Sequence, residues 1–164
     1  MGRHRRVRLR RTGTRFLGFL SDLGSGPVGI DTSICIYFIE QDARYIKLLR
    51  PLFQEADRGA TLLVASAIAL LEVLVLPYRA GNTLLAHKYE SLLTNSRALR
   101  LVPCGFNEVR MAARLRALTN LKTPDAIHLA SAMIAGCATF LTNDRALAPI
   151  PGLRIVQLSD YARV

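Results

Sequence analysis

The sequence lacks three features: an apolar run long enough to cross a membrane, paired cysteines and a large complement of acids. A membrane-spanning helix needs about 18 or more consecutive apolar residues, and no stretch of this chain reaches that length, although 51% of its residues are hydrophobic. The three cysteines, Cys35, Cys104 and Cys137, show no C-x-x-C spacing. Such cysteines are typical of small buried side chains in a reducing compartment, not of disulfides or zinc ligands. We therefore expect a soluble, cytoplasmic protein that does not enter a membrane.

Acidic residues are scarce, with 12 among 164 residues. Four of them nevertheless stand within or beside apolar runs, in the segments VGID, LLEVL, PDAIHLASA and FLTND: Asp31, Glu72, Asp125 and Asp144. Burying an unpaired carboxylate is costly. A shared Mg²⁺ or Mn²⁺ relieves that cost, because hard divalent cations prefer carboxylate oxygens. The pattern therefore predicts a divalent-metal site.

Positive charge is concentrated in the first 27 residues. They hold seven arginines against Asp22 alone, which is +6 of the net +10. Their apolar piece, residues 16–20, is too short for the core of a secretory signal, and residues 24–27 have the composition of a linker. We expect residues 1–27 to be a flexible basic arm and residues 28–164 to be one folded domain. The arm could bind phosphate backbones, lack a role, or reflect a misassigned start codon.

Strand and helix patterns alternate from residue 28 onward. Five short apolar runs are expected to be strands: 28–31, 61–65, 99–102, 138–141 and 153–158. The segments between them have helical periodicity, and Pro51 is expected to kink or divide one helix. Because parallel neighbours need crossover connections, which are commonly helical, this order predicts an α/β three-layer sandwich with a mainly parallel, five-stranded sheet.

The four acids are predicted to meet at one edge of this sheet. Asp31 and Asp144 each follow a strand, and ligands gather at the carboxyl ends of parallel strands. Asp125 lies in the first turn of a helix that begins at Thr123-Pro124, and Glu72 reaches inward from the middle of an apolar helix. Two of the aspartates also have an ordinary explanation, since Asp125 could stabilise a helix dipole and Asp144 could serve as a turn residue; Asp31 is harder to explain in this way.

Taken together, these segments resemble the PIN domains, and in particular the VapC-type toxin ribonucleases of bacterial toxin–antitoxin pairs. The resemblance covers about residues 28–164 and rests on GIDTSICIYFIE, SAIALLEVL, TPDAIHLASAM and FLTNDRAL, in the family's order and approximate spacing. Ser33 stands where many relatives have asparagine. Residues 1–27 have no counterpart in the compact family fold.

The resemblance implies a Mg²⁺- or Mn²⁺-dependent endoribonuclease that hydrolyses RNA phosphodiester bonds, as the toxin of a type II toxin–antitoxin system. Such ions generate a nucleophile from water and neutralise phosphate charge, so no nucleophilic side chain is needed. We assign Asp31 and Asp125 as the principal metal ligands, Asp144 as a second-shell or second-metal ligand, and Glu72 as the residue that holds or activates water. Three hydroxyl residues are expected either to support these carboxylates or to act as local caps: Thr32, Ser33 and Thr142.

The resemblance also implies two protein partners, a small antitoxin whose tail occupies the active-site groove and a second copy of the chain. The apolar run of residues 67–76 could supply a surface for a partner or could pack in the core. RNA is expected to contact basic residues outside the acidic centre. The candidates are Arg79, Lys88, Arg110, Arg114, Arg116, Lys122 and Arg145.

Other roles and other protein classes share parts of this pattern. His128 could be a base or ligand, but we favour a packed, hydrogen-bonded histidine because hard ions do not favour imidazole. A haloacid-dehalogenase-like phosphatase expects a second aspartate where this chain has Ser33, and a nuclease of DNA ends or flaps usually needs a longer chain with more acids. The non-enzyme alternative is a catalytically silent RNA-binding module of the same fold, against which the four acids argue.

Overall fold

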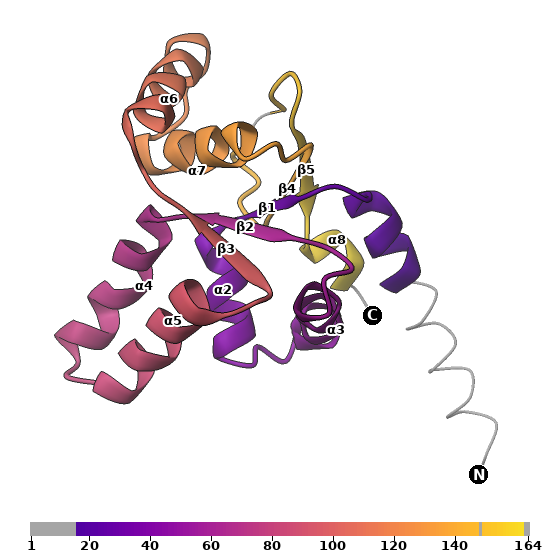
Figure 1. Cartoon of the computed structure of the whole chain (residues 1–164), viewed down its shortest axis with the longest axis vertical. Helices are drawn as coiled ribbons and strands as arrows, with labels where there is room; N and C mark the ends of the chain where they lie inside the picture. Colours follow the sequence, from indigo (N-terminus) through magenta and orange to yellow (C-terminus); the bar gives the residue numbers. More distant parts are fainter. Residues whose placement is uncertain (1–15, 148, 163–164) are drawn as a thin grey trace.

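The computed structural model describes residues 16–147 and 149–162, which fold around a central sheet with helices on both faces (Figure 1). The strands are β1 (Val28–Ile30), β2 (Leu63–Ser66), β3 (Leu99–Val102), β4 (Thr139–Thr142) and β5 (Arg154–Gln157). They lie in the order β3-β2-β1-β4-β5, and each neighbouring pair is parallel. The predicted three-layer α/β/α sandwich with a five-stranded sheet is confirmed.

The helices divide between the two faces of the sheet. They are α2 (Thr32–Ile39), α3 (Ile46–Asp57), α4 (Ile68–Arg79), α5 (Thr83–Asn95), α6 (Phe106–Leu118), α7 (Thr123–Ile134) and α8 (Ser159–Ala162). Helices α2 to α5 share one apolar core with the sheet, and α6 and α7 form a second core on the opposite face. Pro51 lies inside α3, which continues as one undivided helix.

The strand order reverses at β1, which has β2 on one side and β4 on the other. The chain leaves β1 through helices on one face of the sheet, and it enters β4 from α7 on the opposite face (Figure 1). In open parallel sheets, such a reversal leaves a crevice at the carboxyl ends of the flanking strands. The fold therefore places the residues that follow β1 and β4 at the position where ligands bind in this architecture.

A close contact between β1, β4 and α7 fixes the spacing of this region. A Cβ atom added to Gly29 in β1 would lie 2.6 Å from the Cβ of Ala132 in α7 and 2.6 Å from Cδ2 of Phe140 in β4. The Phe140 ring is buried, with 1% exposure. Glycine at position 29 therefore allows α7 to pack directly on β1. Because α7 also carries Asp125, this packing sets the distance between Asp125 and the end of β1.

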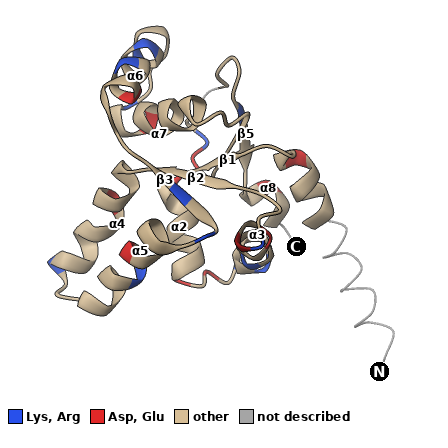
Figure 2. Ribbon diagram, viewed as in Figure 1, with Lys and Arg blue, Asp and Glu red and all other residues tan. Residues whose placement is uncertain are grey.

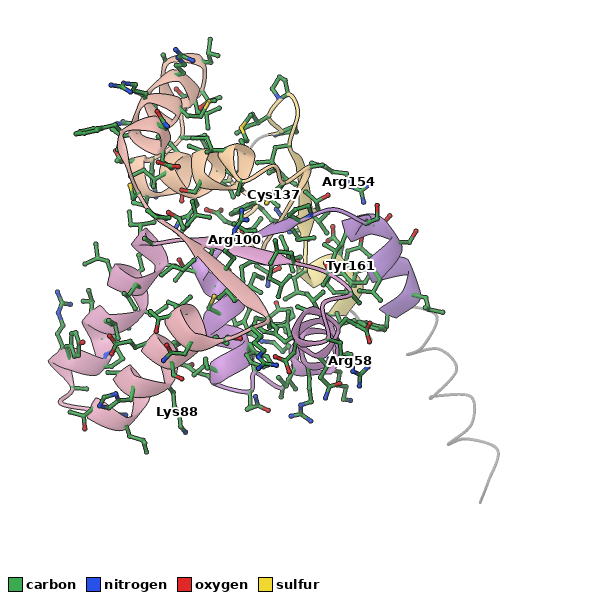
Figure 3. All side chains as sticks on the ribbon, viewed as in Figure 1. Arg58, Lys88, Arg100, Cys137, Arg154 and Tyr161 are labelled. Carbon is green, nitrogen blue, oxygen red and sulfur yellow. The ribbon has the colours of Figure 1, made fainter. Side chains whose placement is uncertain are left out.

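The helix formed by residues 16–23 packs against the carboxyl-terminal part of the domain. The ring centroids of Phe19 and Tyr161 lie 5.1 Å apart. The Tyr161 hydroxyl donates a hydrogen bond to the carboxylate of Asp22, which also forms a salt bridge of 3.4 Å with Arg154. Arg154 and Tyr161 lie beside this helix in Figure 3. An aromatic contact and an ionic contact thus anchor the helix.

For residues 16–23 the structure differs from the flexible arm expected over residues 1–27. Phe19 and Leu23 are 0% and 3% exposed and belong to the core shared by α2 to α5. Apolar side chains on one face of a helix are more stable when they pack against the domain than when they are exposed to water. Residues 1–15, which hold all seven arginines of the arm, lie outside the described residues.

The cysteines partly match their expected burial. Cys35 and Cys137 are buried and free, and burial raises the pKa of the Cys35 thiol to about 12 and that of Cys137 to about 11. Cys104 is exposed, because it lies in the loop before α6 and not in a packed element. None of the helices in the described ranges has the length and apolarity that crossing a bilayer requires.

Candidate active site

Asp31 lies at the carboxyl end of β1, directly before α2. Its backbone amide donates to the Leu141 carbonyl at 3.0 Å, which joins the end of β1 to β4. Its side chain makes no capping hydrogen bond to α2. Instead, Oδ2 accepts hydrogen bonds from Thr142 Oγ1 at 2.7 Å and from Ser33 Oγ at 3.2 Å. Two hydroxyl groups thus orient this carboxylate at the reversal point of the sheet.

Asp144 follows β4 and is connected to Asp31 through Thr142. The fully buried Thr142 hydroxyl donates to Asp31 and accepts a hydrogen bond of 2.9 Å from the Asp144 amide. The Asp144 side chain is exposed, and its Oδ1 accepts from the Ala146 amide at 2.8 Å. This last contact is the turn role considered for Asp144. Asp144 thus makes a turn contact and also lies near the other acids.

Asp125 lies in the first turn of α7 and is half-buried. Burial raises the pKa of Asp125 above its ordinary value, and the negative charges of Asp144 and Asp31 raise it further. His128 and Lys122 act in the opposite direction. The charges of Asp31 and Asp144 thus reach Asp125, and we call these three residues the aspartate group.

Glu72 reaches the same region from α4 but bonds to different partners. Its Oε2 accepts a hydrogen bond from Thr32 Oγ1 and lies 2.9 Å from His128 Nε2. Burial acts to raise the pKa of Glu72, but the hydrogen bonds from His128 and Thr32 outweigh it and hold the pKa below its ordinary value. The Glu72 side chain is 32% exposed, so it is less enclosed than its apolar neighbours suggested. The adjacent Leu71 also faces solvent, with 64% exposure.

His128 connects α7 to this carboxylate. It is 4% exposed, and its Nε2 lies 3.3 Å from Thr32 Oγ1 in addition to its contact with Glu72. The interpretation of His128 as a packed, hydrogen-bonded histidine is therefore confirmed. The Glu72–His128 pairing itself was not predicted, and the D-x-x-H spacing after Asp125 gave no indication of it.

In metal-free protein, we expect Asp125→Asn and Glu72→Gln to change stability in opposite directions. The pKa of Asp125 is higher in the folded chain than in the unfolded chain, so the folded chain binds more protons between these two pKa values. The free energy of unfolding therefore falls as pH rises through this range, and the loss persists at pH 7. Asp125→Asn should therefore stabilise the protein at pH 7 by about 0.5–2 kcal/mol. The lowered pKa of Glu72 contributes stability at pH 7 that is lost as pH falls through the folded value, so Glu72→Gln should destabilise.

Urea unfolding in EDTA at pH 7 and pH 3 measures both differences. Each should shrink at pH 3, where the two carboxyl groups are increasingly protonated in the folded and unfolded chains. Asp57→Asn, at an exposed position of α3, is the charge-matched control and should stay within about 0.5 kcal/mol. Loss of stability in Asp125→Asn at pH 7 would contradict the assigned repulsion.

The donor chemistry of this group suits a hard divalent cation. Asp31, Asp125 and Asp144 supply carboxylate oxygens at one edge, and their mutual repulsion is relieved by positive charge. Within the described ranges, however, no three His, Cys, Asp or Glu side chains converge closely enough to hold an ion together. The roles assigned to these residues and to Thr32, Ser33 and Thr142 remain predictions.

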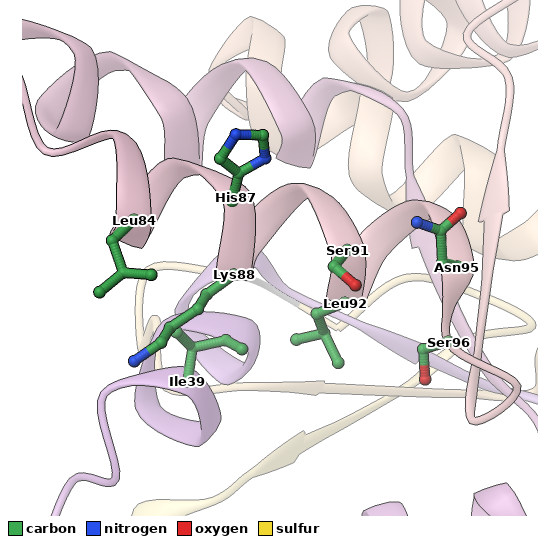
Figure 4. Close-up of a pocket in the computed structure, with 8 residues that line it drawn as sticks. All are labelled: Ile39, Leu84, His87, Lys88, Ser91, Leu92, Asn95 and Ser96. Atoms are coloured by element: carbon green, nitrogen blue, oxygen red, sulfur yellow. The ribbon is translucent and has the colours of Figure 1, made fainter.

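A separate pocket lies between α5 and the end of α2 (Figure 4). It has a volume of about 450 Å³, and its lining includes Ile39, Leu84, His87, Lys88 and Leu92. Ile39 is the last residue of α2, whereas Asp31 precedes the first. The pocket therefore lies at the opposite end of α2 from the aspartate group.

Comparisons with known proteins identify similar sequences and folds. A family model described as PIN domain matches residues 28–153. No curated protein matches the chain significantly. A chain in a structure of VapBC2 from Rickettsia felis bound to a promoter DNA fragment has a TM-score of 0.62 and 18% identity, over 80% of this chain and 98% of that one.

Two further solved structures show the same fold. A chain of a toxin–antitoxin complex from Klebsiella pneumoniae has a TM-score of 0.58 and 22% identity, over 82% of this chain and 98% of that one. A chain of DNA-bound VapBC from Salmonella typhimurium has a TM-score of 0.58 and 21% identity, over 81% of this chain and 98% of that one.

Proposed function

The chain belongs to the PIN-domain family, and from this membership we propose that it is a divalent-metal-dependent endoribonuclease that hydrolyses RNA phosphodiester bonds. The observation that carries the proposal is the aspartate group at the sheet edge, where burial and then the charges of Asp144 and Asp31 raise the pKa of Asp125. Perturbed carboxyl groups at the switch point of a parallel sheet are typical of a functional site. A purely structural role would not require three acids to repel one another there.

In this proposal, Asp31, Asp125 and Asp144 hold Mg²⁺ or Mn²⁺. When bound, such an ion supplies a nucleophile at neutral pH and neutralises charge on the scissile phosphate. Thr142 and Ser33 keep the Asp31 carboxylate in one orientation through their hydrogen bonds. This orientation matters because ligands that are positioned in advance lose less freedom on binding.

Glu72 has a distinct part in the proposal. Its lowered pKa keeps it ionised at neutral pH but also makes it a weak proton acceptor. Glu72 therefore orients water by accepting a hydrogen bond, and His128 and Thr32 hold its carboxylate in place.

We further propose that the chain is the toxin of a type II toxin–antitoxin pair, that it acts in the cytoplasm and that it forms a homodimer. Solved complexes from Klebsiella pneumoniae and Salmonella typhimurium share its fold. The hairpin of α4 and α5 exposes Leu71 at 64%, Leu76 at 70% and Leu84 at 68%. Several exposed apolar side chains on one hairpin are compatible with a protein interaction site, and this hairpin is the proposed contact for an apolar segment of the antitoxin.

Cleavage of a mixed RNA pool by the purified full chain tests the proposed activity. We expect RNA cutting in Mg²⁺ or Mn²⁺ and none in EDTA, because the nucleophile and the charge neutralisation both depend on the ion. Product ends mapped by sequencing would identify the preferred site. RNA that is bound but never cut under any of these conditions would instead favour a catalytically silent RNA-binding module.

A further inference from the structure

The outer face of α6 carries an unusual aromatic residue. Phe106, the first residue of α6, is 82% exposed, although a phenylalanine ring is normally buried. The Arg110 guanidinium carbon lies 5.9 Å from the centroid of the Phe106 ring, within cation–π range. Val109, between them in sequence, is 50% exposed. A flat apolar ring flanked by a cation therefore faces solvent.

The charge of this face is positive and uncompensated. Arg110 and Arg114 are both exposed and stand one helical turn apart on the same side of α6. Among the residues that the structure describes, neither forms a salt bridge. The one acid of α6, Glu108, is buried and accepts a hydrogen bond from the Gly105 amide at 3.0 Å. Figure 2 shows basic positions along α6.

The end of α6 is fixed close to the aspartate group. Arg116 donates to the Leu121 carbonyl at 3.1 Å and to Thr123 Oγ1 at 2.9 Å, which ties the loop between α6 and α7. Lys122 in this loop is exposed and stands three residues before Asp125 in the sequence. Cations thus continue from the outer face of α6 to the edge of the acidic centre.

From this arrangement we propose that the outer face of α6 binds single-stranded RNA, with a base stacked on Phe106 and phosphates on Arg110 and Arg114. The proposal rests on the proposed function and identifies where its substrate is held. Exposed aromatic rings stack with unpaired bases, and arginines beside them neutralise phosphates. The rise of an α-helix separates Phe106 from Arg114 by about 12 Å along the axis, so a short segment of RNA can contact all three side chains. From there the strand leads past Lys122 toward Asp125.

Binding of fluorescent oligouridine RNA to the full chain in EDTA tests this surface without cleavage. We expect Arg110→Ala with Arg114→Ala to weaken binding about tenfold and to reduce the slope of log K against log salt by about 1.4, as two lost phosphate contacts require. The matched control is Lys47→Ala with Arg58→Ala, at exposed positions in α3 and at its C-cap, on the opposite face of the sheet. This pair removes the same charge and should change Kd less than about twofold. Both double variants retain residues 1–15, so any contribution of these residues to RNA affinity is the same in both.

The aromatic residue is tested separately. Phe106→Leu should weaken binding about tenfold because stacking is lost, whereas Phe106→Tyr should keep nearly full affinity. Equal losses in the α6 and α3 pairs would overturn the proposal in favour of general charge attraction. Unchanged RNA affinity in Phe106→Leu, with a shift from dimer to monomer in sedimentation, would overturn it in favour of a contact between two copies.

These outcomes are independent of the nuclease activity. If the α6 variants lose RNA binding but the wild-type chain never cuts RNA, the binding surface stands and the proposed hydrolysis fails. If the wild-type chain cuts RNA with metal and the α6 variants bind and cut equally well, the hydrolysis stands and the surface is overturned.

Discussion

Asp31→Asn is expected to reduce metal-dependent RNA cleavage by at least about 100-fold, since even residues that only support a metal ligand commonly contribute 10–100-fold. Asparagine has the size of aspartate and can still accept hydrogen bonds from Thr142 and Ser33. The substitution therefore removes the negative charge with little change of packing. Cleavage rates in Mg²⁺ and in Mn²⁺, with EDTA as the baseline, measure the loss.

Two controls accompany this variant. Asp57→Asn removes one negative charge at an exposed position of α3 and should leave the cleavage rate unchanged. RNA affinity in EDTA should be equal or higher in Asp31→Asn, because a carboxylate that repels phosphate is gone. Full metal-dependent cleavage by Asp31→Asn would show that the aspartate group is not the catalytic centre.

Phe140→Ala is expected to cost about 3–5 kcal/mol in the free energy of unfolding, the largest effect on stability that we predict. The Phe140 ring is 1% exposed and packs against Gly29 at the contact of β1 with α7. Its removal leaves a cavity beside the strand that carries Asp31. Phe106→Ala is the matched control: it makes the same change at an 82% exposed position and should alter stability by less than about 0.5 kcal/mol.

A double-mutant cycle locates this effect at the contact with Gly29. Gly29→Ala alone should cost about 1–3 kcal/mol, because its Cβ would overlap both Phe140 and Ala132. In the Phe140→Ala background its cost should be smaller, since one of the two overlapping groups is absent. Urea unfolding of the four proteins gives the coupling free energy. Strictly additive costs would show that the two positions do not share this contact.

The sequence by itself determined the fold class of this protein. Buried parallel strands require nearly continuous apolar runs, and five such runs alternate with helical segments from residue 28 onward. Local signals of this kind also placed Asp31 and Asp144 after strands and Asp125 in the first turn of a helix, because strand ends and helix starts are governed by nearby residues. The expected architecture followed from the need of parallel strands for crossover connections.

Tertiary structure alone decided which side chains meet. Glu72 pairs with His128 across 56 positions, and Thr142 reaches Asp31 across 111. Neither contact can be predicted from the periodicity of the sequence. Both depend on the order of strands in the sheet and on the face that each crossover helix covers. The same reason explains residues 16–23, which were expected to be part of a flexible basic arm. Their apolar face packs against Tyr161, and only the folded domain brings these two segments together.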